Sequence, residues 1–406
     1  MAIDLVRPIH QRAHGATGPF ARLQCRVFAA LGAVVFLAGA SLSTAAPATA
    51  APARLGAGLA FAWGYNHNGE LGNGTNTDTN LPVAVKGLTG VTAISTGSHH
   101  CLALLSSGKV KAWGDNFYGE LGTGTGTSSN LPVTVKGLSG VKAVSAGGLF
   151  SLALLSNGTV KAWGVNNSGQ LGNATFASST LPVTVKGLTG VKAISAGGRD
   201  GLALLSNGTV MAWGSNTAGE LGNGSTVADS NVPVAVSGLT GVKAISAGGF
   251  HSLALLSGGT VMAWGYNLDG ELGNGTNTSS NVPVAVSGLA GVKAISAGGG
   301  QGLALLSNGT VMAWGYNGEG ELGNGTNTSS NVPVAVSGLA GIKAISAGGD
   351  NSLALLPDAK VMAWGDDLDG QLGNGANISS NLPVAVKGLA GVKAVSAGFE
   401  HGLARK

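Results

Sequence analysis

Charged residues are scarce in this sequence: Asp, Glu, Lys and Arg make up 10% of its 406 residues, where a typical soluble domain carries about 25%. This scarcity argues against a coiled coil, a protein with a charged tail and most helical bundles. Cysteine is scarce as well. Of the two cysteines, only Cys101 lies beyond residue 50, so the chain after that residue has no intramolecular disulfide.

Glycine, in contrast, is abundant, with 71 residues. Its spacing has no three-residue period, which excludes a collagen-like triple helix. Hydrophobic residues make up 44% of the chain, too many for a disordered protein. A glycine-rich and turn-rich sequence that can still bury a core predicts an all-β fold.

Residues 1–50 differ in character from the rest. Four arginines precede an apolar run at residues 27–40, and small residues follow up to the A-T-A triplet at 48–50. This order is typical of a secretory signal peptide, so we expect a signal over 1–50 and an exported, extracellular mature chain, with association with the cell surface left open. The alternative is a membrane anchor, but the run is shorter than the roughly 20 residues that a span requires. No membrane association is expected after cleavage.

Removing this segment changes the charge balance. It contains four of the 22 basic residues and one of the 18 acidic residues, so residues 51–406 carry almost no net charge. A chain without a net positive charge is not expected to bind nucleic acid.

Internal repetition indicates the architecture of residues 51–406. All seven tryptophans recur at intervals of 50 residues, with one interval of 51; they are Trp63, Trp113, Trp163, Trp213, Trp264, Trp314 and Trp364. Short apolar runs bounded by Gly and Pro predict four strands per unit. Around Trp264 and onward to Trp314 these strands are expected at 284–286, 292–296, 303–307 and 310–314.

The Asn-Gly pairs between two such runs, for example Asn157-Gly158, predict two-residue primed hairpin turns. The N-G-T triplets also match a glycosylation sequon, but we interpret them as turns of a bacterial exported protein. Seven units of four strands predict a seven-bladed β-propeller. The alternative, a solenoid, would need polar caps at both ends. Here the chain instead begins and ends with complementary halves of one unit, which predicts that both termini close one blade.

The repeat also resembles a known family. The pattern W-G-x-N-x-x-G-E-L-G-x-G, followed by P-x-x-V and by G-x-x-H-x-L-A-L, resembles the regulator of chromosome condensation repeat, and it recurs between Gly58 and Ala404. The resemblance implies a seven-bladed propeller and much less about activity, because such propellers serve unrelated partners. The repeat is similar as well to that of secreted bacterial propellers that inhibit β-lactamases, although their units are shorter.

A hairpin determines which loops share a face. The segment before each central hairpin and the loop after each Trp lie at one end of the blade, which we call the loop face; the Asn-Gly turns lie at the other end, the hairpin-turn face. Variable aromatic and charged residues gather on the loop face, which predicts a binding surface. The residues expected there are Phe117, Tyr118, Phe150, Arg199, Asp200, Phe250, His251, Tyr266, Tyr316, Asp350 and Glu400.

The strongest predicted anchors are Tyr118, Phe150 and Phe250, because the core of the repeat does not require them. The alternative is that these side chains, and the tyrosines after W-G, pack between blades. Acidic residues also lie in loop-face segments, apart from Asp358, which favours a partner with a cationic surface. The Glu of G-E-L-G occupies a repeat position, and we interpret it as holding its loop.

Four histidines form a candidate metal cluster, because the split blade and its neighbour bring them to the same region; they are His67, His99, His100 and His401. Histidines with one carboxylate could bind zinc, but no short ligand spacing supports the site. No nucleophile motif or phosphate loop is present, so neither catalysis nor a cofactor is expected.

The leading hypothesis is a secreted, monomeric, non-enzymatic propeller that binds a protein through an acidic and aromatic loop face. The alternatives are a glycan-binding module, since aromatic platforms beside Asn and Asp also suit sugars, and inhibition of a β-lactamase. The family name further implies nucleotide exchange on a Ran-type GTPase. The signal peptide, the absence of a basic tail and the uniform length of the units disfavour that activity.

Overall fold

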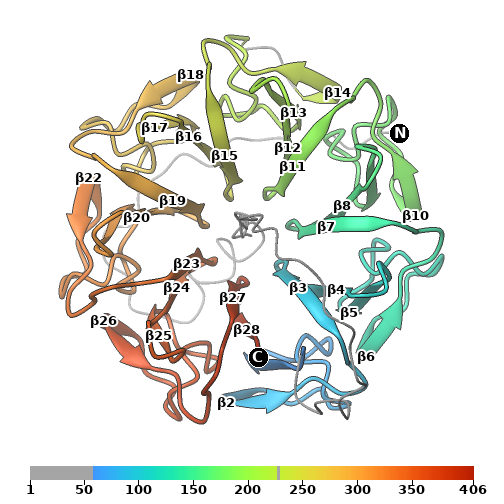
Figure 1. The fold of residues 1–406 in the computed structure, drawn as a ribbon, viewed down its shortest axis with the longest axis horizontal. Coiled ribbons are helices and arrows are strands. Elements are labelled where there is room, and N and C mark those ends of the chain that lie inside the picture. The colour runs from blue at the N-terminus through green and yellow to red at the C-terminus, as the bar shows by residue number, and fades with distance from the viewer. Residues whose placement is uncertain (1–57, 226–228) are drawn as a thin grey trace, which may run out of the picture.

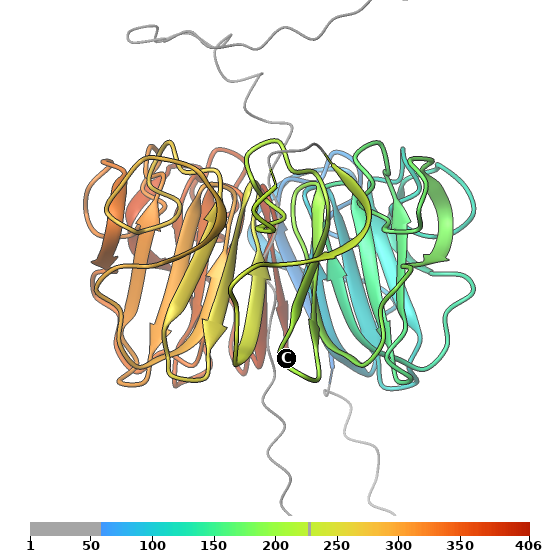
Figure 2. The ribbon, with the colours of Figure 1, turned by 90° about the horizontal axis from the view of Figure 1, so that it is seen from above.

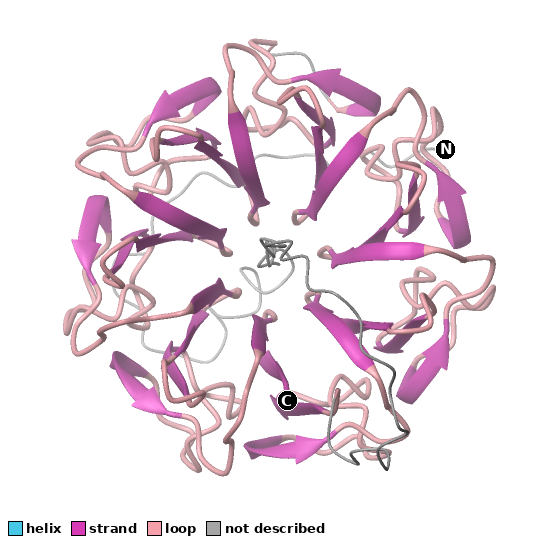
Figure 3. Ribbon diagram, viewed as in Figure 1, coloured by secondary structure: helices cyan, strands magenta, loops and turns pink. Residues whose placement is uncertain are grey.

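Seven four-stranded antiparallel sheets surround a central axis in the computed structural model of the chain (Figure 1). The structure describes residues 58–225 and 229–406, and the proposed signal and its boundary at residue 50 lie outside this part. All regular elements in the described ranges are strands (Figure 3). No helix in those ranges is long and apolar enough to cross a membrane. The predicted all-β seven-bladed propeller is therefore confirmed.

The blades are numbered along the chain, and each contains four strands in order from the axis outward. Blades 1 to 3 contain β3 (Val91–Thr96), β4 (His100–Leu105), β5 (Val110–Gly114) and β6 (Ser129–Thr134); β7 (Val141–Ala146), β8 (Phe150–Leu155), β9 (Val160–Gly164) and β10 (Ser179–Thr184); β11 (Val191–Ala196), β12 (Asp200–Leu205), β13 (Val210–Gly214) and β14 (Ser230–Ala235). Blades 4 to 6 contain β15 (Val242–Ala247), β16 (His251–Leu256), β17 (Val261–Gly265) and β18 (Ser280–Ala285); β19 (Val292–Ala297), β20 (Gln301–Leu306), β21 (Val311–Gly315) and β22 (Ser330–Ala335); β23 (Ala344–Ala347), β24 (Asn351–Leu355), β25 (Val361–Gly365) and β26 (Ser380–Ala385).

Blade 7 combines the two ends of the described chain, as predicted. It contains β27 (Ala394–Ala397), β28 (His401–Arg405), β1 (Ala60–Gly64) and β2 (Thr79–Ala84). The two central strands pair in antiparallel register from Ala60↔Arg405 to Gly64↔His401. Strands from both ends thus complete one sheet, so all seven blades have four strands and the ring is closed.

The hydrophobic core lies between blades rather than within them. One cluster, for example, joins Leu71 and Val85 of blade 7 to Ile94 and Trp113 of blade 1. Each tryptophan also donates a hydrogen bond across the interface; Trp113 Nε1 lies 2.8 Å from the carbonyl oxygen of Glu70. The seven tryptophans are fully buried and make the same kind of bond. The Trp spacing therefore marks the blade interfaces.

The hairpin turns differ from the prediction. The amide of Leu155 donates to Thr159 O at 2.9 Å, and that of Gly158 donates to Leu155 O at 3.0 Å. This pattern defines a three-residue loop in which only Gly158 has a positive φ, of 83°. Such a type I turn followed by a glycine bulge also suits the right-handed strand twist. The predicted two-residue primed turn is therefore wrong.

The two ends of the ring are unequal. The chain end at Lys406, marked C in Figure 2, lies on the hairpin-turn face. The loop face carries the tight turns between the first and second strands, and also the longer loops that follow each Trp-Gly. These longer loops, which we call the long loops, precede the outermost strands. They carry most of the variation between blades.

Candidate functional site

Several predicted surface residues are buried. Phe150, Asp200 and His251 each begin the second strand of a blade, and their exposed fractions are 0%, 2% and 1%. Glu400 is buried as well. Phe150 belongs to the core cluster that contains Trp213. The prediction of these four as exposed partner-binding residues is therefore wrong.

The glycines before these positions explain the burial. A Cβ on Gly147 would lie 2.4 Å from the Phe150 ring and 2.9 Å from Gly197 O of the next blade. The amide of Gly148 also donates to Gly197 O at 3.0 Å. Adjacent blades therefore approach so closely at this turn that the first side chain of the second strand fills the space between them.

The residue immediately before the second strand is half-buried in several blades; examples are Arg199, Phe250 and Asp350. The Phe250 ring packs against Tyr266, with ring centroids 6.2 Å apart. Tyr316 remains exposed, and its ring lies beside Gly300. The tyrosines after Trp-Gly therefore pack against the neighbouring turns with different degrees of exposure.

The exposed aromatic side chains lie in the long loops. Phe117 and Tyr118 of blade 1 are 73% and 43% exposed, and their rings meet edge to face with centroids 4.8 Å apart. Phe176 in the long loop of blade 2 is 53% exposed. Our sequence analysis missed Phe176, although the signal was present, since this position is Asn in four other blades.

That recurrent Asn forms an inter-blade contact, which we call the Asn clamp. In blade 5, Asn327 Nδ2 donates to Gly318 O of its own loop at 3.0 Å. Asn327 Oδ1 accepts from Asn381 Nδ2 at the start of β26 in blade 6, at 2.7 Å. The same clamp joins Asn76 to Asn130, Asn277 to Asn331 and Asn377 to Asn80.

Two adjacent interfaces lack the clamp because its loop Asn is replaced. Between blades 1 and 2 the two positions hold Gly126 and Thr180, and between blades 2 and 3 the loop position holds Phe176. At the interface of blades 3 and 4, Asn281 Nδ2 donates to Gly224 O instead, at 3.2 Å. We call the loop-face surface over blades 1 to 4 the variable sector, because it departs from the repeat.

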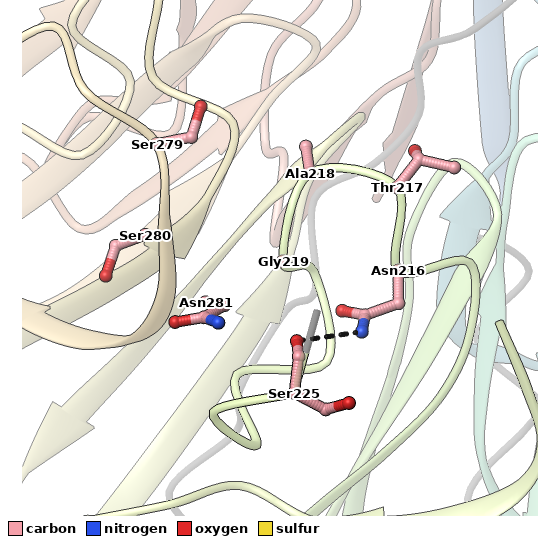
Figure 4. A pocket seen from close by; sticks show the side chains of 8 residues that line it. All are labelled: Asn216, Thr217, Ala218, Gly219, Ser225, Ser279, Ser280 and Asn281. Atoms are coloured by element: carbon pink, nitrogen blue, oxygen red, sulfur yellow. Dashed lines mark hydrogen bonds between the residues drawn. The ribbon is translucent and has the colours of Figure 1, made fainter. Parts of the chain in front are cut away.

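A polar groove crosses the variable sector at the interface of blades 3 and 4 (Figure 4). Its volume is about 430 Å³, and hydroxyl and amide side chains form most of its wall. Asn216, Thr217 and Ser225 come from the long loop of blade 3, and Ser279, Ser280 and Asn281 come from blade 4. The variable sector thus combines exposed aromatic rings with a hydrogen-bonding groove.

The four candidate histidine ligands do not form a metal site. His67 is exposed and its Nε2 lies 3.4 Å from Asp78 Oδ2, whereas His99 Nδ1 lies 3.8 Å from Glu70 Oε1. His100 and His401 are buried, and desolvation lowers the pKa of each to about 3. Among the described residues, no group of three or more His, Cys, Asp or Glu side chains is placed to hold a metal ion.

The repeat glutamates hold their loops, as interpreted. Glu321 Oε2 accepts from the amide of Glu319 at 3.0 Å, and Gln371 makes the same bond to the amide of Asp369 at 2.9 Å. Burial raises the pKa of Glu70, Glu120 and Glu271 to about 7 and that of Glu321 to about 8. These carboxyl groups are buried, so the loop face presents less negative charge to solvent than its composition suggests.

The blade geometry agrees with the family match. Residues 141–404 match the RCC1-like domain, and residues 57–104 and 107–154 match the regulator of chromosome condensation (RCC1) repeat. The chain belongs to the RCC1-like propeller family. The variable sector of this RCC1-like propeller includes positions that depart from the repeat, namely Gly126, Phe176 and Thr180.

Solved structures show the same fold. Human WBSCR16 aligns with a TM-score of 0.78 and 24% identity, over 86% of this chain and 98% of its own. Prp20p from Saccharomyces cerevisiae aligns with a TM-score of 0.76 and 24% identity, over 86% and 92%. The yeast protein in complex with Kap60 aligns with a TM-score of 0.77 and 21% identity, over 91% of this chain and 96% of its own. No curated protein shows a significant match to the sequence.

Proposed function

We propose that this RCC1-like propeller is an exported, non-catalytic scaffold that binds a protein partner through the variable sector of its loop face. The observation that carries the proposal is the coincidence of the missing Asn clamps with exposed rings. Phe117, Tyr118 and Phe176 lie in the long loops of two adjacent blades. Exposed aromatic anchors contribute a large share of the binding energy in protein interfaces.

Export rests on the signal-like residues 1–50. The family supports a protein partner more generally, because an RCC1-like propeller is mainly an interaction scaffold. The structure of yeast Prp20p was reported with its binding to Gsp1p and histones, and a second yeast structure contains Kap60. Those partners are partners of the yeast protein. At 24% and 21% identity, its similarity to this chain supports a shared fold and not shared partners.

The variable sector replaces the binding surface that our sequence analysis favoured. Phe150 is core, and Phe250 packs against Tyr266, so neither is the preferred anchor. Half-buried acids such as Asp115 border the exposed rings, and Asp115 Oδ1 accepts from the amide of Phe117 at 3.3 Å. The bordering carboxylates favour a partner with basic residues around an apolar centre.

Photocrosslinking tests the proposal directly. A photoreactive phenylalanine at position 117 or 176 should yield one defined protein adduct on cells of the producing organism, whereas the same residue at position 61 should not. Phe117→Ala with Phe176→Ala should then reduce affinity for the captured protein by at least about tenfold, corresponding to 1.4 kcal/mol. Unchanged affinity, with an unchanged melting temperature, would refute the variable sector as the binding site.

The polar groove supports one alternative, a glycan-binding module. Its wall of hydroxyl and amide groups could exchange hydrogen bonds with a sugar, and the exposed rings lie in the long loops of blades 1 and 2. Glycan-array binding that Asn281→Ala abolishes, without a protein adduct at position 117, would favour this alternative. Array binding without sensitivity to Asn281 would argue against it.

A further inference from the structure

Positive charge gathers at the end of the ring opposite the variable sector. Every described Lys and Arg except Arg199 lies at the start of an inner or third strand, in a hairpin turn, in a connector between blades, or at the chain end by Arg405. All these places lie at the hairpin-turn end. Among the described residues, the one acidic side chain at that end belongs to Asp358, whose Oδ2 lies 2.8 Å from Lys360 Nζ.

The charge is unevenly distributed around the ring. In blade 2 it forms a radial row, with Lys142 on the innermost strand β7, Lys161 on β9 and Lys186 just after the outermost strand β10. Equivalent or nearby positions in blades 1 and 7 are also basic. We call these cations the basic arc: Lys86, Lys109, Lys111, Lys136, Lys142, Lys161, Lys186, Lys393, Arg405 and Lys406.

Blades 3 to 5 lack most of this charge. Their third strands carry Met where blade 2 has Lys161, and their connectors carry Ser where blade 2 has Lys186; the residues are Met211, Met262, Met312, Ser237, Ser287 and Ser337. Only Lys192, Lys243 and Lys293 remain, one in each blade on the hairpin-turn face. Blade 6 carries Lys343, Lys360 and Lys387, and Lys360 is paired with Asp358. The ten cations of the basic arc lie in the three consecutive blades 7, 1 and 2, where no described acidic residue lies at this end.

Lysines of the arc contact neutral groups. Lys111 Nζ donates to Thr134 Oγ1 at 2.9 Å, and Lys161 Nζ donates to Thr184 Oγ1 at 2.7 Å. Lys406 Nζ lies 4.3 Å from the centroid of the Phe61 ring. Each ammonium group has three donor hydrogens, so Lys111 and Lys161 retain donors for an anion. Clustered like charges without nearby carboxylates repel one another, and an anionic ligand would relieve that repulsion.

The surroundings narrow the type of anion. In residues 58–225 and 229–406, the one aromatic ring beside the arc is that of Phe61, which Lys406 covers, so this part of the hairpin-turn face offers no platform for stacking bases. Stable attachment to a bilayer needs an apolar insertion in addition to basic charge. Leu59, whose carbonyl oxygen accepts from the amide of Lys406, is 40% exposed beside the arc, and a single leucine is a small apolar insertion. A flexible polymer with a negative charge on each unit fits the row of lysines in blade 2, which runs from the axis of the ring to its rim.

We propose that the basic arc of blades 7, 1 and 2 binds a linear phosphate polymer by contacts with its backbone. The polymer would lie along the row of Lys142, Lys161 and Lys186 and continue over blade 1. Each phosphate neutralised by a lysine releases a condensed counterion, so affinity depends steeply on salt. This surface lies on the face opposite the variable sector, and one can bind while the other is occupied.

Long-chain inorganic polyphosphate is the probe, and its affinity for the purified full chain is measured by fluorescence anisotropy between about 50 and 200 mM salt. The test variant carries Lys142→Gln, Lys161→Gln and Lys186→Gln. The control carries Lys192→Gln, Lys243→Gln and Lys293→Gln, which removes the same charge from blades 3 to 5.

The test variant should lose at least about tenfold in affinity, and its slope of log K against log salt should fall by roughly two, since each single-strand contact accounts for about 0.7. The control should stay within about threefold. Equal losses in both variants would overturn the proposal, because binding would then follow total charge. Binding to phosphatidylglycerol vesicles without binding to polyphosphate would overturn it as well. If the test variant melts early, Lys109→Gln, Lys111→Gln and Lys136→Gln in blade 1 replace it.

Discussion

The thiol of Cys101 in blade 1 lies 3.2 Å from the imidazole Nε2 of His401 in blade 7, across the interface that closes the ring. Both residues are fully buried. Burial lowers the pKa of the imidazole to about 3 and raises the pKa of the thiol well above its ordinary value. The pair therefore remains neutral at pH 7, and it packs the closing interface rather than activating a nucleophile.

We predict that Cys101 does not react with thiol reagents in the folded protein. A buried thiol with a raised pKa supplies little accessible thiolate. Colour release from a chromogenic disulfide should therefore be negligible in buffer and stoichiometric in denaturant, once Cys25 has been replaced by Ser. Rapid labelling of the folded chain would show that the closing interface opens.

Phe150 and Phe117 should respond differently to truncation. Phe150→Ala leaves a cavity between blades and should cost about 3–5 kcal/mol of unfolding free energy. Phe117 is exposed, so Phe117→Ala should change stability by no more than about 0.5 kcal/mol. Chemical denaturation of both variants measures the difference. Similar losses would mean that the long loop of blade 1 contributes to the core.

Glu321 should make stability depend on pH. Its folded pKa of about 8 exceeds the roughly 4.3 of an unfolded chain. Between these values the folded state holds a proton that the unfolded state has released, so this residue's contribution to stability falls as the pH rises. Glu321→Gln should therefore be more stable than the parent by on the order of 1–3 kcal/mol at about pH 8, and nearly equal at about pH 4.

Denaturant unfolding at both pH values measures the effect, and Glu319→Gln, two residues away and half-buried, is the matched control. The native glutamines at positions 170 and 371 make the same loop bond and show that Gln fits. A Glu321→Gln effect of the same size at both pH values would contradict an origin in the buried carboxyl group.

The Asn clamp should be transferable to the interface of blades 1 and 2. The double variant Gly126→Asn with Thr180→Asn places both amides where the other interfaces have them, and Gly126 has no positive φ. Its new Cβ would lie 3.3 Å from Phe117 O, the carbonyl that corresponds to the acceptor of the native clamps. We expect a gain of about 0.5–1 kcal/mol in unfolding free energy. Thr180→Asn alone should change the unfolding free energy little. If this single variant were stabilised as much as the double variant, the clamp would not be the source of the stability.

The sequence was sufficient to determine the architecture because the same pattern of strands and turns recurs in seven units. The spacing of Trp264 and its equivalents, the Gly-bounded apolar runs and the split unit at the two ends were sufficient to predict seven blades and their closure. Each of these signals is local, and repetition removes the ambiguity that a single short strand would leave. Similarly, the glutamate of G-E-L-G could be assigned to its loop from its repeat position alone.

The exposure of individual loop-face residues was decided only by the tertiary structure. Phe150 and Phe117 are both aromatic, variable and close to a turn in sequence, but one is buried and the other is exposed. The difference comes from the neighbouring blade: Gly197, 47 positions along the chain, approaches the turn before Phe150, whereas the long loop holds Phe117 outside the interface. The contact of Cys101 with His401, 300 positions apart, likewise exists only once the ring has closed. Such contacts depend on how closely neighbouring blades approach one another in space. The pattern of residues within one blade does not predict that separation.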